Sequence, residues 1–120
     1  MINVSKSAET LQDGIANMMA GAKDDYKQNS LMGKSELSSY CKEKLENFES
    51  QTTVREGKKY IKVIYDRSVF AFIVKEDFKH FKKGDVLKPA GWAAPALNQS
   101  RGNVLEGNYP IQWTGPLYLK

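Results

Sequence analysis

The strongest constraint on the fold is a pair of β-prone runs in the middle of the chain. Residues 59–65 (KYIKVIY) and 69–74 (VFAFIV) consist largely of β-branched and aromatic residues, which favour strands. The polar spacer Asp66-Arg67-Ser68 between two such runs predicts a β-hairpin. Shorter β-type runs at 52–55 and 86–88 flank the pair. We therefore expect a small antiparallel sheet over roughly residues 52–120.

The first 50 residues carry apolar side chains at spacings of three and four, which predicts helices. The first helix is expected over roughly residues 5–28 and the second over roughly 35–50, each with a serine as N-cap. The apolar face of the first consists of Leu11, Ile15, Met18, Met19, Ala22 and Tyr26. We interpret its methionines as core filling against a partner surface, either the sheet or a second copy of the chain. The expected fold class is α+β, with an N-terminal helical hairpin packed on, or swapped against, the sheet.

Length and charge limit the class of protein further. A chain of 120 residues is long enough for one domain, expected to span residues 1–120. The net charge of +4 is unevenly divided, because residues 1–50 carry −2 and residues 51–120 carry +6. We therefore expect residues 1–50 to form a helical assembly region and residues 51–120 to form a basic, β-rich ligand-binding core.

The low counts of cysteine and histidine exclude several kinds of site. One Cys cannot form an internal disulfide and one His excludes a His-rich metal centre, so neither a metal nor a cofactor is expected. No apolar run approaches the ~20 residues of a membrane span. Residues 1–30 also lack the pattern of a signal peptide. These features predict a cytoplasmic protein with no membrane partner.

The last thirty residues combine little charge with several aromatic rings. Arg101, Glu106 and Lys120 are the only charged residues after position 90. Because disordered tails are poor in aromatic residues, we expect a packed irregular lid or a binding loop here.

An Arg-Gly-Asn element in this stretch supplies the parts of a nucleotide site. An arginine can grip a phosphate or stack on a base, an asparagine can read a ring or ribose edge, and an aromatic ring can form a stacking wall. The candidate ligand-binding residues are Arg101, Asn103, Asn98, Trp92, Arg67 and Phe72. The element is also compatible with a turn built around a buried structural arginine, which is the less favoured alternative.

Several motifs resemble those of a family of small phage-encoded proteins. They are a Gly-Asp strand (84–85), a Trp-x-x-Pro-Ala turn (92–96), the Arg-Gly-Asn element (101–103) and a closing Gly-x-x-Tyr-Leu (115–119). The match covers roughly residues 67–120, and Gly91 stands where many relatives have Ser.

The layout of N-terminal helices and a small β-core also resembles the Thoeris anti-defence sponge proteins. Those proteins sequester cyclic ADP-ribose signals and, in some relatives, cyclic oligonucleotides. The resemblance implies a phage protein that binds a bacterial immune signal intact in the cytoplasm of the infected host cell. It also implies a homodimer or higher homo-oligomer assembled through the N-terminal helices.

Three other functions remain open at this point. A general nucleic-acid-binding protein would use the +6 half to follow a phosphate backbone, but its 12 cations are scattered, so long nucleic acid is disfavoured. A phage structural or protein-interaction module would dock a partner on the aromatic C-terminus. A nucleotide hydrolase would need paired carboxylates, and Asp66, Asp85 and Glu106 have no supporting spacing. We therefore predict a binding protein and not an enzyme.

Overall fold

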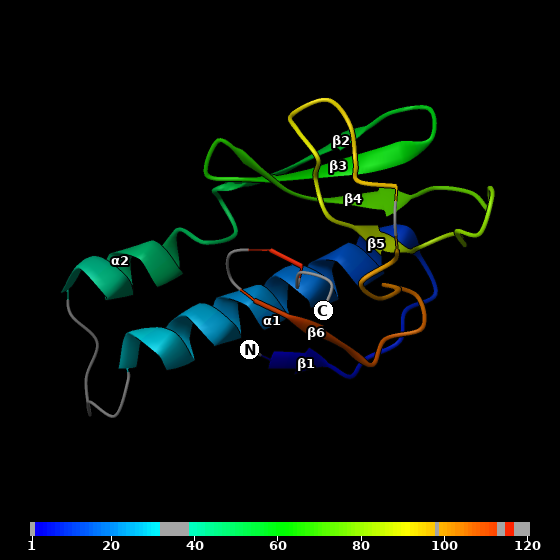
Figure 1. Ribbon diagram of the computed structural model, residues 1–120. Coiled ribbons are helices and arrows are strands. Elements are labelled where there is room, and N and C mark those ends of the chain that lie inside the picture. Colours follow the sequence, from blue (N-terminus) through cyan, green and yellow to red (C-terminus); the bar gives the residue numbers. More distant parts are fainter. Residues whose placement is uncertain (1, 32–38, 98, 113–114, 117–120) are drawn as a thin grey trace.

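The computed structural model describes residues 2–31, 39–97, 99–112 and 115–116 (Figure 1). Its helices are α1 (Leu11–Leu31) and α2 (Ser39–Glu46). The main antiparallel sheet has the strand order β2-β3-β4-β5, with bounds Thr52–Glu56, Tyr60–Tyr65, Ser68–Val74 and Val86–Leu87. A second sheet pairs β1 (Ile2–Val4) with β6 (Tyr109–Ile111). The expected α+β fold, with two N-terminal helices packed against small antiparallel sheets, is confirmed.

The predicted hairpin of β3 and β4 forms the centre of the main sheet. In its turn, Asp66 and Arg67 have φ angles of 47° and 69°. Two consecutive residues with positive φ are typical of the type I′ turn, whose twist suits adjacent antiparallel strands. A register shift beside Val63 and Ile64 leaves one extra residue in β4, so Phe70 and Ala71 both belong to the core on the α1 side.

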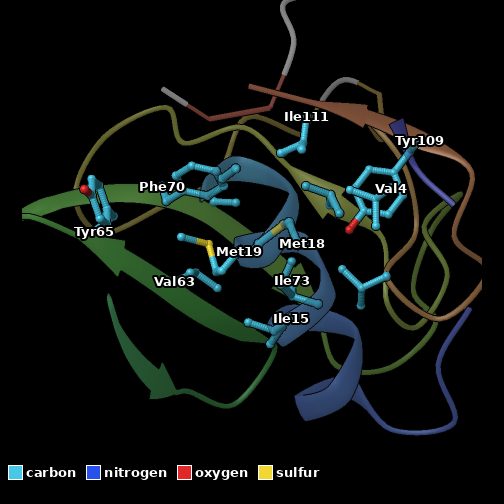
Figure 2. Packing of buried hydrophobic residues seen from close by; sticks show 14 of the residues in the cluster. Val4, Ile15, Met18, Met19, Val63, Tyr65, Phe70, Ile73, Tyr109 and Ile111 are labelled. Atoms are coloured by element: carbon cyan, nitrogen blue, oxygen red, sulfur yellow. The ribbon is translucent and has the colours of Figure 1, made fainter. Parts of the chain in front are cut away.

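Helix α1 lies across one face of the main sheet and supplies the middle of the core (Figure 2). The side chains of Ile15, Met18, Met19, Ala22 and Tyr26 are all buried, which confirms their interpretation as core filling. They pack with the inner residues of β3 and β4 and with the β1–β6 pair, including Val63, Phe70, Ile73, Val4, Tyr109 and Ile111. The apolar face of α1 therefore has its partner surface within its own chain.

Helix α1 begins later than the sequence predicted. The hydroxyl Oγ1 of Thr10 accepts a hydrogen bond from the backbone N–H of Asp13 at 3.1 Å, the geometry of an N-cap. Residues 2–4 form a strand instead of leading into the helix, and that strand pairs with β6 from the other end of the chain. The first 50 residues therefore do not form a separate helical unit, because their first strand belongs to a sheet that β6 completes.

Helix α2 is shorter than the predicted second helix, whose first residues, 35–38, lie outside the described residues. It contains no buried residue. The chain after it is anchored by Phe48, whose ring stacks on Tyr65 with a centroid distance of 4.5 Å. Neither described helix is long and apolar enough to cross a membrane.

Candidate functional site

The Arg-Gly-Asn element lies beside β5, held by backbone hydrogen bonds. The Arg101 N–H donates to the Val86 carbonyl and the Val86 N–H donates to the Gly102 carbonyl, both at 2.8 Å. Gly102 has a φ of 151°, and a Cβ at this position would lie 2.4 Å from the Cβ of Tyr109. Glycine is therefore required here for both its backbone angle and the close approach of the tyrosine.

The side chain of Asn103 is buried and fully hydrogen-bonded within the protein. Its Nδ2 donates to the Lys83 carbonyl at 2.9 Å and to Asp85 Oδ1 at 3.0 Å. Its Oδ1 accepts from the backbone N–H groups of Leu105 and Glu106 at 2.9 and 3.1 Å. A carboxamide has two donor and two acceptor positions, and all are used. We correct the predicted role of Asn103, because no polar position is left for a ligand.

Phe72 is only 2% exposed, so its ring cannot serve as the predicted stacking wall. It lies in a second apolar cluster with Val74, Phe81 and Leu87 on the face of the sheet opposite α1. Its edge-to-face neighbour is Tyr60, at 5.9 Å between centroids. The ring is thus a packing element beneath the outer surface of the sheet. Asn98 lies outside the described residues.

The two candidate arginines have different surroundings. Arg101 is partly buried and its Nη1 donates to the Gln99 carbonyl at 2.7 Å. Lys88 lies close to it, donates from Nζ to the Pro116 carbonyl at 2.8 Å, and has a lowered pKa because of burial and, secondarily, the positive charge of Arg101. Arg67 is exposed in the β3–β4 turn. No described contact joins the two arginines, and their role in ligand binding stays a prediction.

Trp92 is half-exposed, with 50% of its surface accessible, and stands on the outer face of the main sheet. It belongs to the loop after β5, drawn in yellow in Figure 1, which rises on the side of the sheet away from α1. The loop is closed by a bridge between Pro89 and Pro95. The Nζ of Lys62 lies 4.6 Å from the centroid of the indole ring, within range of a cation–π contact.

Lys62 has a second cation directly opposite it in the sheet. In the β2–β3 register its partner is Arg55, and such partners have Cβ atoms about 5 Å apart on the same face. Like charges in this position destabilise a sheet. Neither cation forms an ion pair with a carboxylate in the described part of the chain. We call Arg55, Lys62 and Trp92 the outer-face cluster.

Trp92 was predicted from the sequence, whereas the two cations of the outer-face cluster were not. Alternation along 59–65 places Lys62 on the same side as Tyr60, and this signal could have identified it. Arg55 carried no comparable signal, because its position opposite Lys62 depends on the strand register.

A family model matches residues 1–119, nearly the whole chain. The chain belongs to DUF7717, a family of unknown function. The match includes the helical N-terminus, which the motif resemblance did not cover. Neither a curated protein nor a solved structure matches this DUF7717 chain. Within its described residues, no group of three or more His, Cys, Asp or Glu side chains is placed to hold a metal ion.

Proposed function

We propose that this DUF7717 chain binds a small phosphate-bearing nucleotide at the outer-face cluster and releases it chemically unchanged. The observation that carries the proposal is the pair of opposed cations, Arg55 and Lys62, beside the half-exposed ring of Trp92. A phosphate between two cations relieves their repulsion. An aromatic ring beside them stacks on a base, which is worth about 1–3 kcal/mol.

The size of the outer-face cluster favours a small ligand over a long polynucleotide. Proteins that follow single strands present successive rings along a basic groove. Among the described large apolar side chains that are exposed, Trp92 and Tyr40 are the aromatic ones, and Tyr40 belongs to α2 instead of the sheet. One exposed ring with two cations fits a single base and its phosphates.

The resemblance of the layout to the Thoeris anti-defence sponge proteins supports a finer proposal for the ligand. A sponge-type protein from a phage would sequester a cyclic ADP-ribose-type immune signal in the cytoplasm of its bacterial host, with cyclic oligonucleotides as a second class. Cyclic ADP-ribose combines a purine ring with a pyrophosphate, the two groups for which the cluster has partners. It is therefore the first probe to use.

Calorimetric titration of the full chain with cyclic ADP-ribose tests the proposal. We expect Trp92→Ala and Lys62→Gln each to weaken binding about tenfold or more, because loss of one stacking or phosphate contact costs at least about 1.4 kcal/mol. Lys42→Gln is the matched control, since it removes an exposed charge on α2, and its affinity should equal that of the native chain. Equal affinities for all these proteins would contradict the proposed site.

Arg101→Ala belongs in the same titration, because the sequence predicted this residue as the principal ligand contact. If the outer-face cluster is the site, this variant keeps its affinity. Loss of binding with an unchanged thermal melt would instead move the ligand to the Arg101–Lys88 pair.

The chemical state of the ligand separates a binding protein from an enzyme. Heat release of the bound molecule should return intact cyclic ADP-ribose, whereas a hydrolysis product would overturn the sponge proposal. An oligonucleotide that binds with a steep salt dependence, in preference to the small nucleotide, would favour the nucleic-acid alternative.

A further inference from the structure

The outer edge of β2 is an unpaired strand edge in the described sheet. β2 is the first strand in the order β2-β3-β4-β5, so only one of its edges is paired. Native edge strands are usually shortened or carry charged side chains, a proline, a bulge or an inward-pointing charge, and of these β2 has only the charges of Arg55 and Glu56 at its end. β2 has five residues, no proline and a continuous register with β3. Three of its residues, Thr52, Thr53 and Val54, are β-branched and favour further pairing.

The hydrogen bonds around β2 show which backbone groups point outward. The Asp66 N–H donates to the Gln51 carbonyl, and the Gly57 N–H donates to the Tyr60 carbonyl. Hydrogen-bonded residues alternate along an antiparallel pair, so positions 51, 53, 55 and 57 face β3. The N–H and carbonyl groups of Val54 and Glu56 therefore point to the outer edge. The carbonyl of Thr52 points there as well, whereas its N–H donates to Glu49.

Val54 is the midpoint of β2, and its side chain is 49% exposed on the α1 side of the sheet. Its partner in β3 is Val63, which is buried in the core on that side. Next to Val54 lies an open cleft of about 550 Å³ whose apolar lining includes Leu11 and Ile15 of α1. An exposed valine, an apolar cleft and an open edge thus lie together.

We propose that two copies of this chain pair antiparallel through their β2 edges, with Val54 of one copy opposite Val54 of the other. A two-fold axis at Val54 overlaps the full strand and forms about four backbone hydrogen bonds. The pairing places Arg55 opposite Thr53 and Glu56 opposite Thr52, so no like charges stand directly opposite each other, and the two Arg55 side chains are diagonal neighbours on the outer face. A second copy of the chain is the partner that fits this register, because the outward N–H and carbonyl groups of β2 can pair with the same groups of an antiparallel copy.

The pairing has a consequence for the outer-face cluster. Arg55 of each copy points to the outer face near the axis, because it shares that face with Lys62. The two clusters would then form one row of cations with a tryptophan towards each end. This arrangement suits a ligand with two phosphates, and in this respect the inference rests on the proposed function.

Sedimentation of the full chain over a wide concentration range tests the pairing without any ligand. We expect a species of about twice the 13.5 kDa of one chain. Val54→Pro should give a monomer, because it removes an outward N–H while leaving the β2–β3 hydrogen bonds intact. Val54→Thr keeps the N–H and should remain a dimer. A native chain that sediments as a monomer at every concentration, or a dimeric Val54→Pro, would overturn the proposal.

A charge exchange tests the register even if the proline variant fails to fold. Val54→Lys and Val54→Glu should each be monomeric, because the two-fold axis places each new charge against itself. An equal mixture of the two should restore a dimer containing one copy of each. Persisting homodimers of either variant, or no dimer in the mixture, would contradict the axis at Val54. Because no nucleotide is present, these outcomes are independent of the titration that tests the proposed function.

Discussion

Asp85 and Asn103 connect two turns that lie 18 residues apart in the chain. Asp85 Oδ2 accepts from the Lys82 N–H at 2.9 Å, while Oδ1 accepts from Asn103. Gly84 has a φ of 93°, and a Cβ there would lie 2.7 Å from Asn103 Oδ1. The Gly-Asp and Arg-Gly-Asn motifs, separate in the sequence, are therefore two halves of one structural clamp.

Replacing Asn103 with Ala should lower the free energy of unfolding by at least about 2 kcal/mol. The substitution removes a partner from the buried Asp85 carboxylate and from two backbone N–H groups, and each buried group left unsatisfied costs about 1–3 kcal/mol. Urea unfolding measures the change. Asn3→Ala is the control, since Asn3 is exposed on β1 and its loss should cost less than about 0.5 kcal/mol. Equal unfolding midpoints for both variants would show that the Asp85–Asn103 contact does not stabilise the fold.

At the scale of elements, α2 is the most weakly attached part of the described fold. It has eight residues, none of them buried, and isolated helices of this length are marginal in water. Its side chains and those just after it reach α1 through Lys44, which lies 5.0 Å from the Tyr26 ring centroid, and through a 3.0 Å ion pair between Lys23 and Glu49. The ion pair is largely exposed and contributes little. The Lys44 contact lies on the buried ring of Tyr26, and Leu45 of α2 is partly buried against the core.

Amide hydrogens of α2 should exchange much faster than those of α1. Exchange protection follows local stability, and α1 carries the centre of the core whereas α2 carries no buried residue. Hydrogen exchange read by mass spectrometry gives the comparison, with the β3–β4 hairpin as the protected reference. Protection of α2 equal to that of α1 would show that α2 is covered in solution, which would favour assembly through the helices over pairing through β2.

The hairpin and α1 were predictable because their patterns are local. A β-branched run, a two-residue turn and a helical repeat each depend on neighbours along the chain. The β1–β6 pair was missed for the opposite reason. Each strand has three residues, too few to show a period, and the pairing joins residues more than 100 positions apart.

At the scale of the whole molecule, the core brings together the two ends of the chain. The radius of gyration is 14.2 Å, close to the roughly 13.6 Å expected for a compact chain of this length.

Burial also raises the pKa values of two tyrosines. The pKa of Tyr65 is raised to about 12, first by burial and then by the negative charge of Asp66. Burial raises the pKa of Tyr109 as well.

Stability should therefore decline at alkaline pH. A pKa raised by folding means that the folded state favours the protonated phenol. The stability linked to Tyr65 is fully present below its unfolded pKa of 10.0 and is lost as the pH rises through about 12. Urea unfolding at several pH values measures the decline. The free energy of unfolding of Tyr65→Phe should decline less steeply with pH over this range. Identical slopes for this variant and the native chain would contradict the assignment to Tyr65.

The α+β class, the central hairpin, the apolar face of α1 and the choice of Trp92 as a candidate site residue all follow from the sequence alone. The burial of Asn103 and Phe72 and the position of Arg55 opposite Lys62 become visible only in the folded chain. The same holds for the covering of the apolar face of α1 by the sheet of its own chain. Periodicity and turn chemistry act between residues close along the chain. Burial, register and charge pairing depend on which distant segments meet in space.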